Sequence, residues 1–423
     1  MGRVASIVNE APPEENAMDA IAEDTRLPVD IDAHPLVQAA LALRPELRRY
    51  HKDIEREQRF PPALVAQLHE AGVYRMLLPR ALGGFQVDPL TYTRVVEVLA
   101  EGAGSVGWNI ANNSIGQLVT LGLPDEGVAE IFPSGHATVM AGTAVQGGGK
   151  AVAVEGGYRV TGHWTFGSGC QEATWMLGSF QILDDKEQPQ RRADGGMYWR
   201  GVFRRDEAVV LPGSWDVAGL RGTGSFDWTV TDVFLPERRS VAHVGVPVDN
   251  QWSRWPGVTY ALPSVAWVGP HHSSVITGIA RAGIDALIAL AVEKTPRGRS
   301  GMLCEYPQVQ ESVGKADAML NAGRIYRSAM LTELWNTLAA GHETTMEQRA
   351  RCRLAPIFAA DCARDAMDLM YRYGGSTSFK RGTRLAECWR DLHVVGQTQT
   401  IGPEWYPIGG RALLGMDPGP RLR

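Results

Sequence analysis

The spacing of apolar residues changes twice along this chain, and this change limits the possible folds more than any other feature. Over residues 35–133, and again from about residue 264 onward, apolar side chains recur three and four positions apart, which predicts amphipathic helices. Over residues 138–245 they alternate with polar ones, which predicts half-buried strands. We therefore expect an α+β fold: an N-terminal helical domain, a central β domain and a C-terminal four-helix bundle.

The expected domain boundaries follow these changes in spacing. Residues 1–34 are rich in Glu, Asp, Pro and Ala and carry few large apolar groups, a composition typical of a flexible N-terminal arm. We expect the N-terminal helical domain over residues 35–137, the β domain over 138–250 and the helical bundle over 251–423.

One long stretch, from Trp255 to Ala280, contains no formally charged residue. It is long enough to cross a membrane, but Pro256, Pro263 and Pro270 interrupt it, and such a composition is unusual for a membrane span. We expect instead a buried crossing between domains that continues into a core helix, and therefore no membrane association.

Composition excludes several classes of protein. A net charge of −5 argues against a nucleic-acid-binding protein, which needs a basic face. The five cysteines have no CxxC spacing, so neither a disulfide framework nor a zinc site is expected, and the chain suits a reducing cytoplasm. The first residues also lack the apolar core of a signal peptide. His271 and His272 are adjacent and point in different directions on a helix, so we expect no metal site there.

Six local motifs can be compared with those of known proteins. Four of them are Gly72-Val73-Tyr74-Arg75-Met76-Leu77-Leu78-Pro79, Gly83-Gly84, Gly219-Leu220-Arg221-Gly222-Thr223-Gly224-Ser225 and Val233-Phe234-Leu235-Pro236, and the other two are Trp164-x-Phe166-x-Ser168-Gly169 and Arg390-Asp391-x-His393. The first four, in their order, resemble the acyl-CoA dehydrogenase superfamily from about residue 40 to 415. The last two are similar to motifs of its flavin-dependent monooxygenase branch, the oxygenase components of two-component aromatic hydroxylases.

The resemblance implies a particular chemistry. Enzymes of this branch receive reduced FMN, or FAD, from a separate flavin reductase and use O2 as co-substrate. They form a flavin C4a-hydroperoxide and transfer one oxygen atom to a small aromatic or heteroaromatic substrate. The relatives assemble through the helical bundle, so the resemblance also implies a homotetramer.

The absence of a carboxylate at two positions favours a monooxygenase over a dehydrogenase. A dehydrogenase needs a Glu against the flavin to remove a proton beside a thioester carbonyl. In this chain no carboxylate follows Asp391 before Glu404, and none lies between Asp249 and Asp285. Two alternatives stay open: Glu404 or Glu172 serves as the base of an acyl-CoA dehydrogenase-like FAD enzyme, or the chain is a non-catalytic binding protein that takes no flavin.

Two residues are expected to act in catalysis. His393 is placed beside the flavin, where its imidazole accepts a substrate proton or hydrogen-bonds the distal oxygen of the hydroperoxide. Ser168 is placed against flavin N5, where a hydrogen bond protects the adduct. The plainer alternatives are a His that satisfies a buried partner and a strand-end Ser that satisfies the backbone.

The remaining candidates are expected to bind the cofactor or the substrate. Trp164 and Phe166 are expected to share one strand face and to flank the flavin ring, although both are also ordinary strand residues. Arg297 is expected to bind a flavin phosphate, often across a subunit boundary in the superfamily, and the alternative is a solvated Arg. The other candidates are a phosphate or ring-edge cradle, which is also readable as a helix C-cap (Arg372, Gly374, Gly375 and Ser376), and a pocket-lining helix segment for the substrate (Trp108, Asn112 and Asn113).

Overall fold

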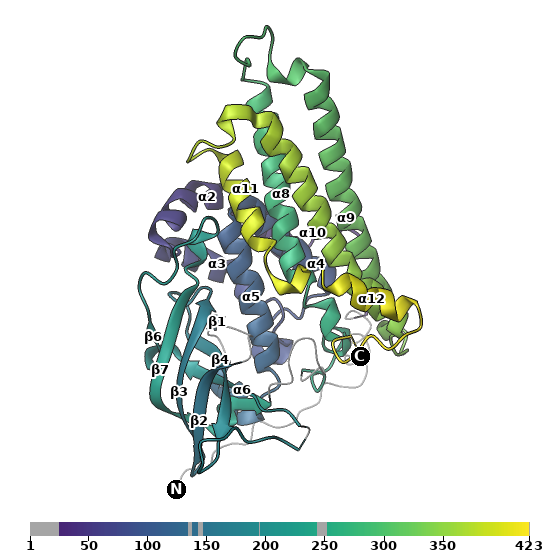
Figure 1. The fold of residues 1–423 in the computed structure, drawn as a ribbon. Helices are drawn as coiled ribbons and strands as arrows, with labels where there is room; N and C mark the ends of the chain where they lie inside the picture. The colour runs from purple at the N-terminus through teal and green to yellow at the C-terminus, as the bar shows by residue number, and fades with distance from the viewer. Residues whose placement is uncertain (1–24, 134–137, 143–146, 194, 243–251, 423) are drawn as a thin grey trace.

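The computed structural model describes residues 25–133, 138–142, 147–193, 195–242 and 252–422. Helices come first, a β-sheet follows, and a bundle of long helices completes the chain, with the sheet at one end of the molecule (Figure 1). The expected α+β fold is confirmed. The helices are α2 (Pro35–Glu57), α3 (Pro62–Glu70), α4 (Pro89–Gly102), α5 (Gly104–Thr120), α6 (Asp125–Ile131), α7 (Val258–Ala261), α8 (Pro270–Ala291), α9 (Pro307–Ala339), α10 (Met346–Gly374), α11 (Arg384–Val395) and α12 (Trp405–Leu413).

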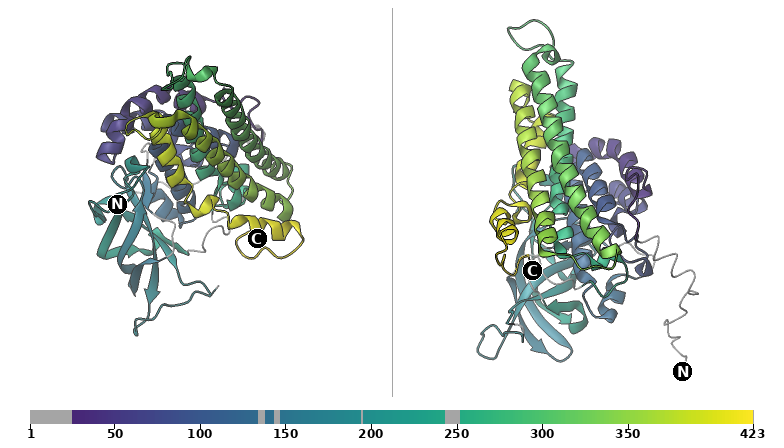
Figure 2. Two further views of the ribbon diagram at one scale, coloured as in Figure 1. Left: turned by 45° about the horizontal axis from the view of Figure 1, so that its top comes forward. Right: turned by 90° about the vertical axis from the view of Figure 1, so that its right-hand side faces the viewer.

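The long helices α8, α9 and α10 run side by side, with the shorter α11 against α8 and α10 (Figure 2). The charge-free stretch ends in the first half of α8. By length and composition the segment Ser264–Ala291 passes for a membrane span, but most of it is buried among α4, α5, α10 and α11. It is the central core helix of the protein, as its prolines and histidines indicated.

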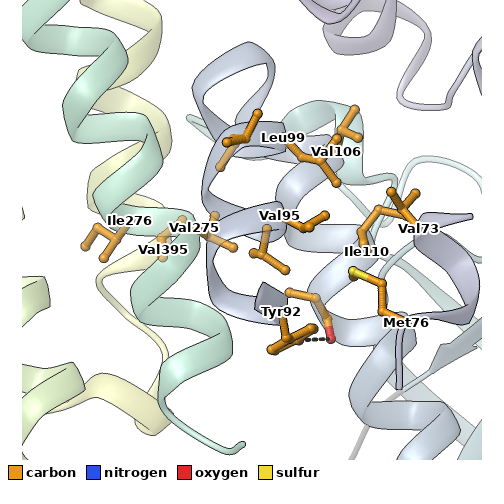
Figure 3. Packing of buried hydrophobic residues seen from close by; sticks show 14 of the residues in the cluster. Val73, Met76, Tyr92, Val95, Leu99, Val106, Ile110, Val275, Ile276 and Val395 are labelled. Carbon is orange, nitrogen blue, oxygen red and sulfur yellow. Dashed lines mark hydrogen bonds between the residues drawn. The ribbon is translucent and has the colours of Figure 1, made fainter. Parts of the chain in front are cut away.

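Helix α4 lies between α5 and α8 and joins the N-terminal helices to the bundle. Val95 and Leu99 of α4 are fully buried, as are Ile110 of α5 and Ile276 of α8 (Figure 3). Each such side chain contributes about 1.5–3 kcal/mol through removal of its apolar surface from water. The Tyr92 hydroxyl donates to the Ala111 carbonyl at 3.2 Å and ties α4 to α5. This shared core fixes α5, which faces the sheet on its other side, relative to α8.

Among the described residues, eight strands form one sheet in the order β6-β7-β3-β2-β4-β5-β8, and β1 pairs with β4 in parallel. β3 pairs antiparallel with both β2 and β7, and a register shift interrupts its pairing with β7 between Trp164 and Gly167. This bulge redirects the end of β3 toward α5. The strands are β1 (Met140–Gly142), β2 (Gly148–Val154), β3 (Gly157–Gly167), β4 (Trp175–Leu183), β5 (Trp199–Arg204), β6 (Val209–Val210), β7 (Phe226–Pro236) and β8 (Ser240–Ala242).

The expected flexible arm, residues 1–34, lies outside the described residues as far as residue 24. The described part is fastened to the helices. The Trp335 indole N–H donates to the Thr25 carbonyl at 2.9 Å, and Arg94 forms an ion pair with Asp32 at 2.7 Å. The domain boundaries at 137/138 and 250/251 stay our proposal.

Candidate active site

Ser168 follows the bulged end of β3, where the chain turns toward the helices. Phe166 has a φ of 61°, and the Ser168 N–H donates to the Phe166 carbonyl at 2.8 Å, so the turn closes tightly. Gly169 has a φ of 76°, a region that favours glycine, and its N–H donates to the Thr223 carbonyl at 2.9 Å. The turn therefore presents a buried Ser168 hydroxyl between the sheet and α5.

A chain of three hydroxyl groups, Ser168–Ser225–Thr223, fixes the direction in which Ser168 donates. Thr223 Oγ1 lies 2.8 Å from the Leu220 carbonyl, which only accepts, so Thr223 donates its single proton there. Ser225 lies 2.7 Å from Thr223 and must therefore donate to it, and Ser168, 2.7 Å from Ser225, must donate to Ser225. The Ser168 oxygen is left as an acceptor only.

Trp108 occupies one of the two acceptor positions of Ser168. Its indole N–H, from α5, donates to Ser168 Oγ at 3.0 Å. Its ring stacks on the imidazole of His272, with centroids 4.1 Å apart and planes 7° apart. Among the residues that the structure describes, the second acceptor position of Ser168 has no donor, and it lies beside a half-buried indole. The structure therefore brings Trp108, a candidate substrate residue, next to Ser168, a candidate flavin residue.

Asn112 and Asn113 support Trp108 in different ways. The Asn112 side-chain amide donates to the Trp108 carbonyl at 3.0 Å, one turn back along α5. Asn113 Oδ1 accepts from the Met140 N–H at 2.8 Å and fastens α5 to β1. Asn113 therefore positions the helix that carries the indole, whereas the Asn112 bond stays within that helix.

His272 is the residue of this cluster that sequence reasoning missed. It is the third residue of α8, and its Nδ1 lies 2.6 Å from the Thr400 hydroxyl and 3.4 Å from that of Thr398. Its Nε2 is buried and has no hydrogen-bond partner among the described residues. Burial, followed by the neighbouring His271 and the Arg353 cation, lowers the pKa of His272 well below its usual value, so the ring is neutral at pH 7.

Arg353 of α10 holds together the two segments that carry His272 and Thr400. Its guanidinium donates to the Val268 and Thr400 carbonyls, each at 2.6 Å, and lies 3.7 Å from the centre of the Trp405 ring. The side chain is buried, and burial lowers the pKa of Arg353 to about 9. Gly269 packs against this guanidinium, which leaves no space there for a Cβ.

The Asp of the Arg-Asp-x-His motif holds the turn η4 (Arg221–Thr223). Asp391 Oδ1 accepts from the Leu220 N–H at 2.7 Å. Glu55 of α2 accepts from the Arg221 and Gly222 N–H groups at 3.1 and 3.0 Å. These two carboxylates hold the turn that contains Thr223, the end of the hydroxyl chain. Asp391 of the motif therefore helps to position Ser168 indirectly, through the backbone of this turn.

His393 points away from this turn. An α-helix advances about 100° per residue, so two positions after Asp391 the side chain lies on nearly the opposite face of α11. The Nε2 of His393 lies 3.0 Å from Asp368 Oδ1 of α10, which also accepts from the Trp389 indole at 2.9 Å. His393 therefore shares no contact with Ser168, Trp108 or His272 in the described part of the chain.

The expected common face of Trp164 and Phe166 is wrong, because the bulge at Phe166 changes the alternation. Trp164 is buried in the sheet core, where it stacks on Trp228 at 4.2 Å and donates to the Ser179 carbonyl at 2.8 Å. Phe166 is 57% exposed and meets the edge of Trp215. Of the two rings, Phe166 alone is open beside Ser168.

The cradle residues and the Arg297 segment meet at the far end of the bundle, beyond α8 and α10 (Figure 1). Lys294 Nζ donates to the Gly374 carbonyl at 2.7 Å and to the Thr377 hydroxyl at 3.0 Å, and Gly375 ends α10 with a φ of 58°. The residues exposed around this contact are Arg297, Arg372, Gly375 and Ser376. The structure thus forms two separate clusters, one around Ser168 and one around Lys294.

Family models match both helical parts of the chain. The acyl-CoA dehydrogenase N-terminal domain matches residues 38–125, and the acyl-CoA dehydrogenase C-terminal domain matches residues 271–402, together more than half of the chain. The chain belongs to the acyl-CoA dehydrogenase family. Within this family, relatives that extend over nearly the whole chain are flavin-dependent monooxygenases, and the chain falls in that branch.

Similarity to the monooxygenases extends over sequence and structure. Indole-3-acetate monooxygenase of Pseudomonas putida is 28% identical over 370 residues, 87% of this chain and 90% of the relative. The flavin-dependent monooxygenase oxygenase subunit HsaA of Rhodococcus jostii (strain RHA1) is 28% identical over 385 residues, 89% of this chain and 97% of the relative. The crystal structure of 3-HSA hydroxylase from Rhodococcus sp. RHA1 has a TM-score of 0.82 at 25% identity and covers 92% of this chain and 98% of that one.

A more distant structure of the same fold holds a reduced flavin. XiaF from Streptomyces sp., solved with FADH2, has a TM-score of 0.81 at 19% identity and covers 96% of this chain and 98% of that one. The residues around Ser168 suit such a group. An open acceptor at Ser168 fits a ring N–H, and the exposed Phe166 ring offers an apolar surface to an aromatic plane.

The side chains of the two carboxylates considered as dehydrogenase bases make other contacts in this member of the acyl-CoA dehydrogenase family. Glu404 is exposed at the start of α12. Glu172 accepts from the Phe60 N–H at 2.9 Å, and burial raises its pKa to about 7. Within the described residues neither one hydrogen-bonds Ser168, Trp108 or His272, so the polar groups at this site are neutral hydroxyls, an indole and an imidazole.

Proposed function

We propose that this chain is the oxygenase component of a two-component monooxygenase that hydroxylates a small aromatic or heteroaromatic substrate. A separate flavin reductase supplies reduced FMN, or FAD in its place, and O2 is the co-substrate. The bound reduced flavin supplies the electrons that activate O2 and carries the oxygen to be transferred. The protein holds the flavin, orients the substrate and keeps water away from both.

The observation that carries this proposal is the hydroxyl chain that ends at Ser168. Because Ser168 keeps an open acceptor beside Trp108, it suits the N5–H of a reduced flavin. A dehydrogenase would instead need a carboxylate here to remove a carbon-bound proton. Neutral hydroxyl and aromatic groups suit a reaction in which oxygen is delivered to an aromatic ring.

The assigned roles follow from these contacts. Ser168 hydrogen-bonds the flavin, Phe166 lies against its ring, and Trp108 borders the substrate. Asn112 and Asn113 keep Trp108 in position. His393 stays a hypothesis as a catalytic residue, since a role beside the flavin requires contacts other than those it makes with Asp368 and Trp389.

The proposed homotetramer explains the second cluster. Arg297, Arg372, Gly375 and Ser376 are exposed at the far end of the bundle, and exposed backbone amides together with guanidinium groups suit a phosphate. A neighbouring chain would bring this cluster to the flavin held at Ser168. Apolar side chains exposed on the bundle helices support such contacts between copies (Ile288, Val292, Ile325 and Phe358). We also propose a cytoplasmic location, which suits the five free cysteines.

The first experiment measures oxygen balance. The protein is mixed with FMN, NADH, a flavin reductase and candidate aromatics, and O2 consumed, H2O2 released and hydroxylated product are quantified. We expect product in place of H2O2 with the wild type, and a larger share of H2O2 with Ser168→Ala. Bleaching of tightly bound FAD by an acyl-CoA, with no hydroxylated product, would refute the proposal.

The second experiment tests the subunit boundary. Ser168→Ala and Arg297→Ala chains are produced separately and then co-expressed. If Arg297 serves a neighbouring chain, about a quarter of the sites in mixed assemblies regain both residues and activity returns. A mixture no more active than the separate variants contradicts the shared site.

A further inference from the structure

The imidazole of His272 is a buried polar group with an unused hydrogen-bonding atom. Its Nδ1 is bonded to Thr400, whereas its Nε2 has no partner among the described residues, and the whole side chain is 5% exposed. An unpaired buried polar atom destabilises a fold, so its presence in a well-packed region calls for an explanation. A ligand that supplies the missing partner provides one.

The position of His272 connects it to the proposed oxygenation site. Trp108 touches both groups: its N–H donates to Ser168, and its ring lies flat on the imidazole. The indole is half-buried, so part of Trp108 is open to solvent. A ligand bound beside Trp108 would be next to both His272 and Ser168, because the indole contacts each of them.

The surroundings hold the imidazole neutral and fix its orientation. Arg353 donates to the carbonyl of Thr400 and to that of Val268, just before α8, and so fixes both ends of the His272–Thr400 contact. His271 lies against His272 with ring centroids 3.7 Å apart. No carboxylate hydrogen-bonds the imidazole in the described part of the chain, so nothing there favours its protonated form.

We propose that His272 selects the substrate of this enzyme by accepting, at Nε2, a hydrogen bond from the ring N–H or phenolic O–H of a small aromatic molecule. The proposal requires the tautomer with the proton on Nδ1, toward Thr400, because only that neutral form presents a lone pair at Nε2. Such a bond draws the substrate proton toward the imidazole and raises electron density on the aromatic ring, which favours electrophilic attack by oxygen. This inference rests on the proposed function and names its substrate class.

The test compares ligands that differ only in the donor. Binding of indole and 1-methylindole, and of phenol and anisole, is measured by calorimetry on the flavin-free full-length protein. We expect the wild type to prefer the donor in at least one pair by about fivefold, which corresponds to about 1 kcal/mol. His272→Ala should bind both members of that pair equally. No preference in the wild type, or one that His272→Ala retains, overturns the inference.

Two further variants keep the test decisive if His272→Ala does not fold. Thr400→Val leaves the imidazole but removes the nearer of the two hydroxyls at Nδ1, and should reduce the preference for the donor. His272→Gln keeps an acceptor and should retain part of it. Ser273→Ala, which alters a buried neighbour on α8 bonded to Arg327, is the control and should leave the preference unchanged. A preference that none of the His272 and Thr400 variants alters overturns the inference.

The oxygen-balance experiment separates this inference from the proposed function. If the wild type hydroxylates an aromatic without any preference for a donor, the oxygenase assignment stands and the role of His272 is wrong. If ligands bind with the expected preference but reduced flavin and O2 give only H2O2 with every aromatic, the oxygenase assignment is wrong.

Discussion

Asp391 is a buried carboxylate whose pKa is raised in the folded state, and substitution by Asn removes its titration. Asp391 is 3% exposed, and burial, together with the nearby charge of Glu55, raises its pKa to about 7. In the unfolded chain an Asp titrates near 3.9. The folded state therefore binds one more proton than the unfolded state between these values. Stability contributed by this proton is complete below the unfolded pKa and is lost as pH rises through about 7.

The size of the effect follows from the two pKa values. Each unit between them is worth about 1.4 kcal/mol, so the wild type should lose about 2 kcal/mol relative to Asp391→Asn between pH 5 and pH 7, and only a few tenths above. The Asn keeps an oxygen that accepts from the Leu220 N–H, so the turn η4 stays held. For a chain of 423 residues, 2 kcal/mol corresponds to about 2–3 °C in melting temperature.

The assay is differential scanning fluorimetry of both proteins at half-unit steps from pH 5 to 8 and at one heating rate. The melting temperature of Asp391→Asn minus that of the wild type should increase from pH 5 to pH 7 and then stay nearly constant. Asp365→Asn, an exposed position on α10, is the matched control and should show a constant difference. A constant difference for Asp391→Asn as well would refute the assigned burial effect.

Three further variants test other parts of the site. Thr223→Val removes the end of the hydroxyl chain, so Ser168 need no longer donate its proton to Ser225. The share of O2 released as H2O2, measured by peroxide assay, should therefore rise. Arg353→Met leaves two buried carbonyls without donors and should cost about 2–4 kcal/mol, or roughly 2–5 °C in melting temperature, whereas Arg353→Lys should cost less. His393→Ala removes a half-exposed contact with Asp368 and should change the melting temperature by only about 1 °C, so any loss of hydroxylated product reports on catalysis.

Periodicity and motif order were sufficient to predict the fold. The change from helical to strand spacing and back located the sheet. The charge-free stretch was interpreted as a buried crossing that continues into a core helix, and that helix is α8. The candidate roles of Trp108 and Ser168 came from the resemblance to a known family, whereas their contact, sixty positions apart in sequence, was found only in the structure. Spacing alone carries no information about such a contact.

Side-chain direction at the site was not predictable in the same way. One extra residue in a strand reverses every later side chain, and the bulge before Gly167 left Phe166 on the exposed side while Trp164 went into the core. The direction of His393 depends on which face of α11 lies against the turn η4, and the hydrogen bond of Asp391 to the Leu220 N–H fixes that face. Both outcomes are set by tertiary contacts between distant segments.

The contact of His272 with Thr400 joins segments 128 positions apart, which no local pattern encodes. A signal was nevertheless present. Two histidines in a stretch without any formal charge must be buried as neutral rings, and neutral buried imidazoles are often functional. Adjacent positions argued against a metal site but did not argue against a hydrogen-bonding role.

The one-way order of the hydroxyl chain has a consequence for the catalytic cycle. N5 of a flavin carries a hydrogen before oxidation and only a lone pair afterwards, so a serine whose own proton is already donated to Ser225 attracts the first form and repels the second. The site should therefore bind reduced flavin more tightly than oxidised flavin. Oxidised flavin would then leave the site and return to the reductase without a conformational change that releases it.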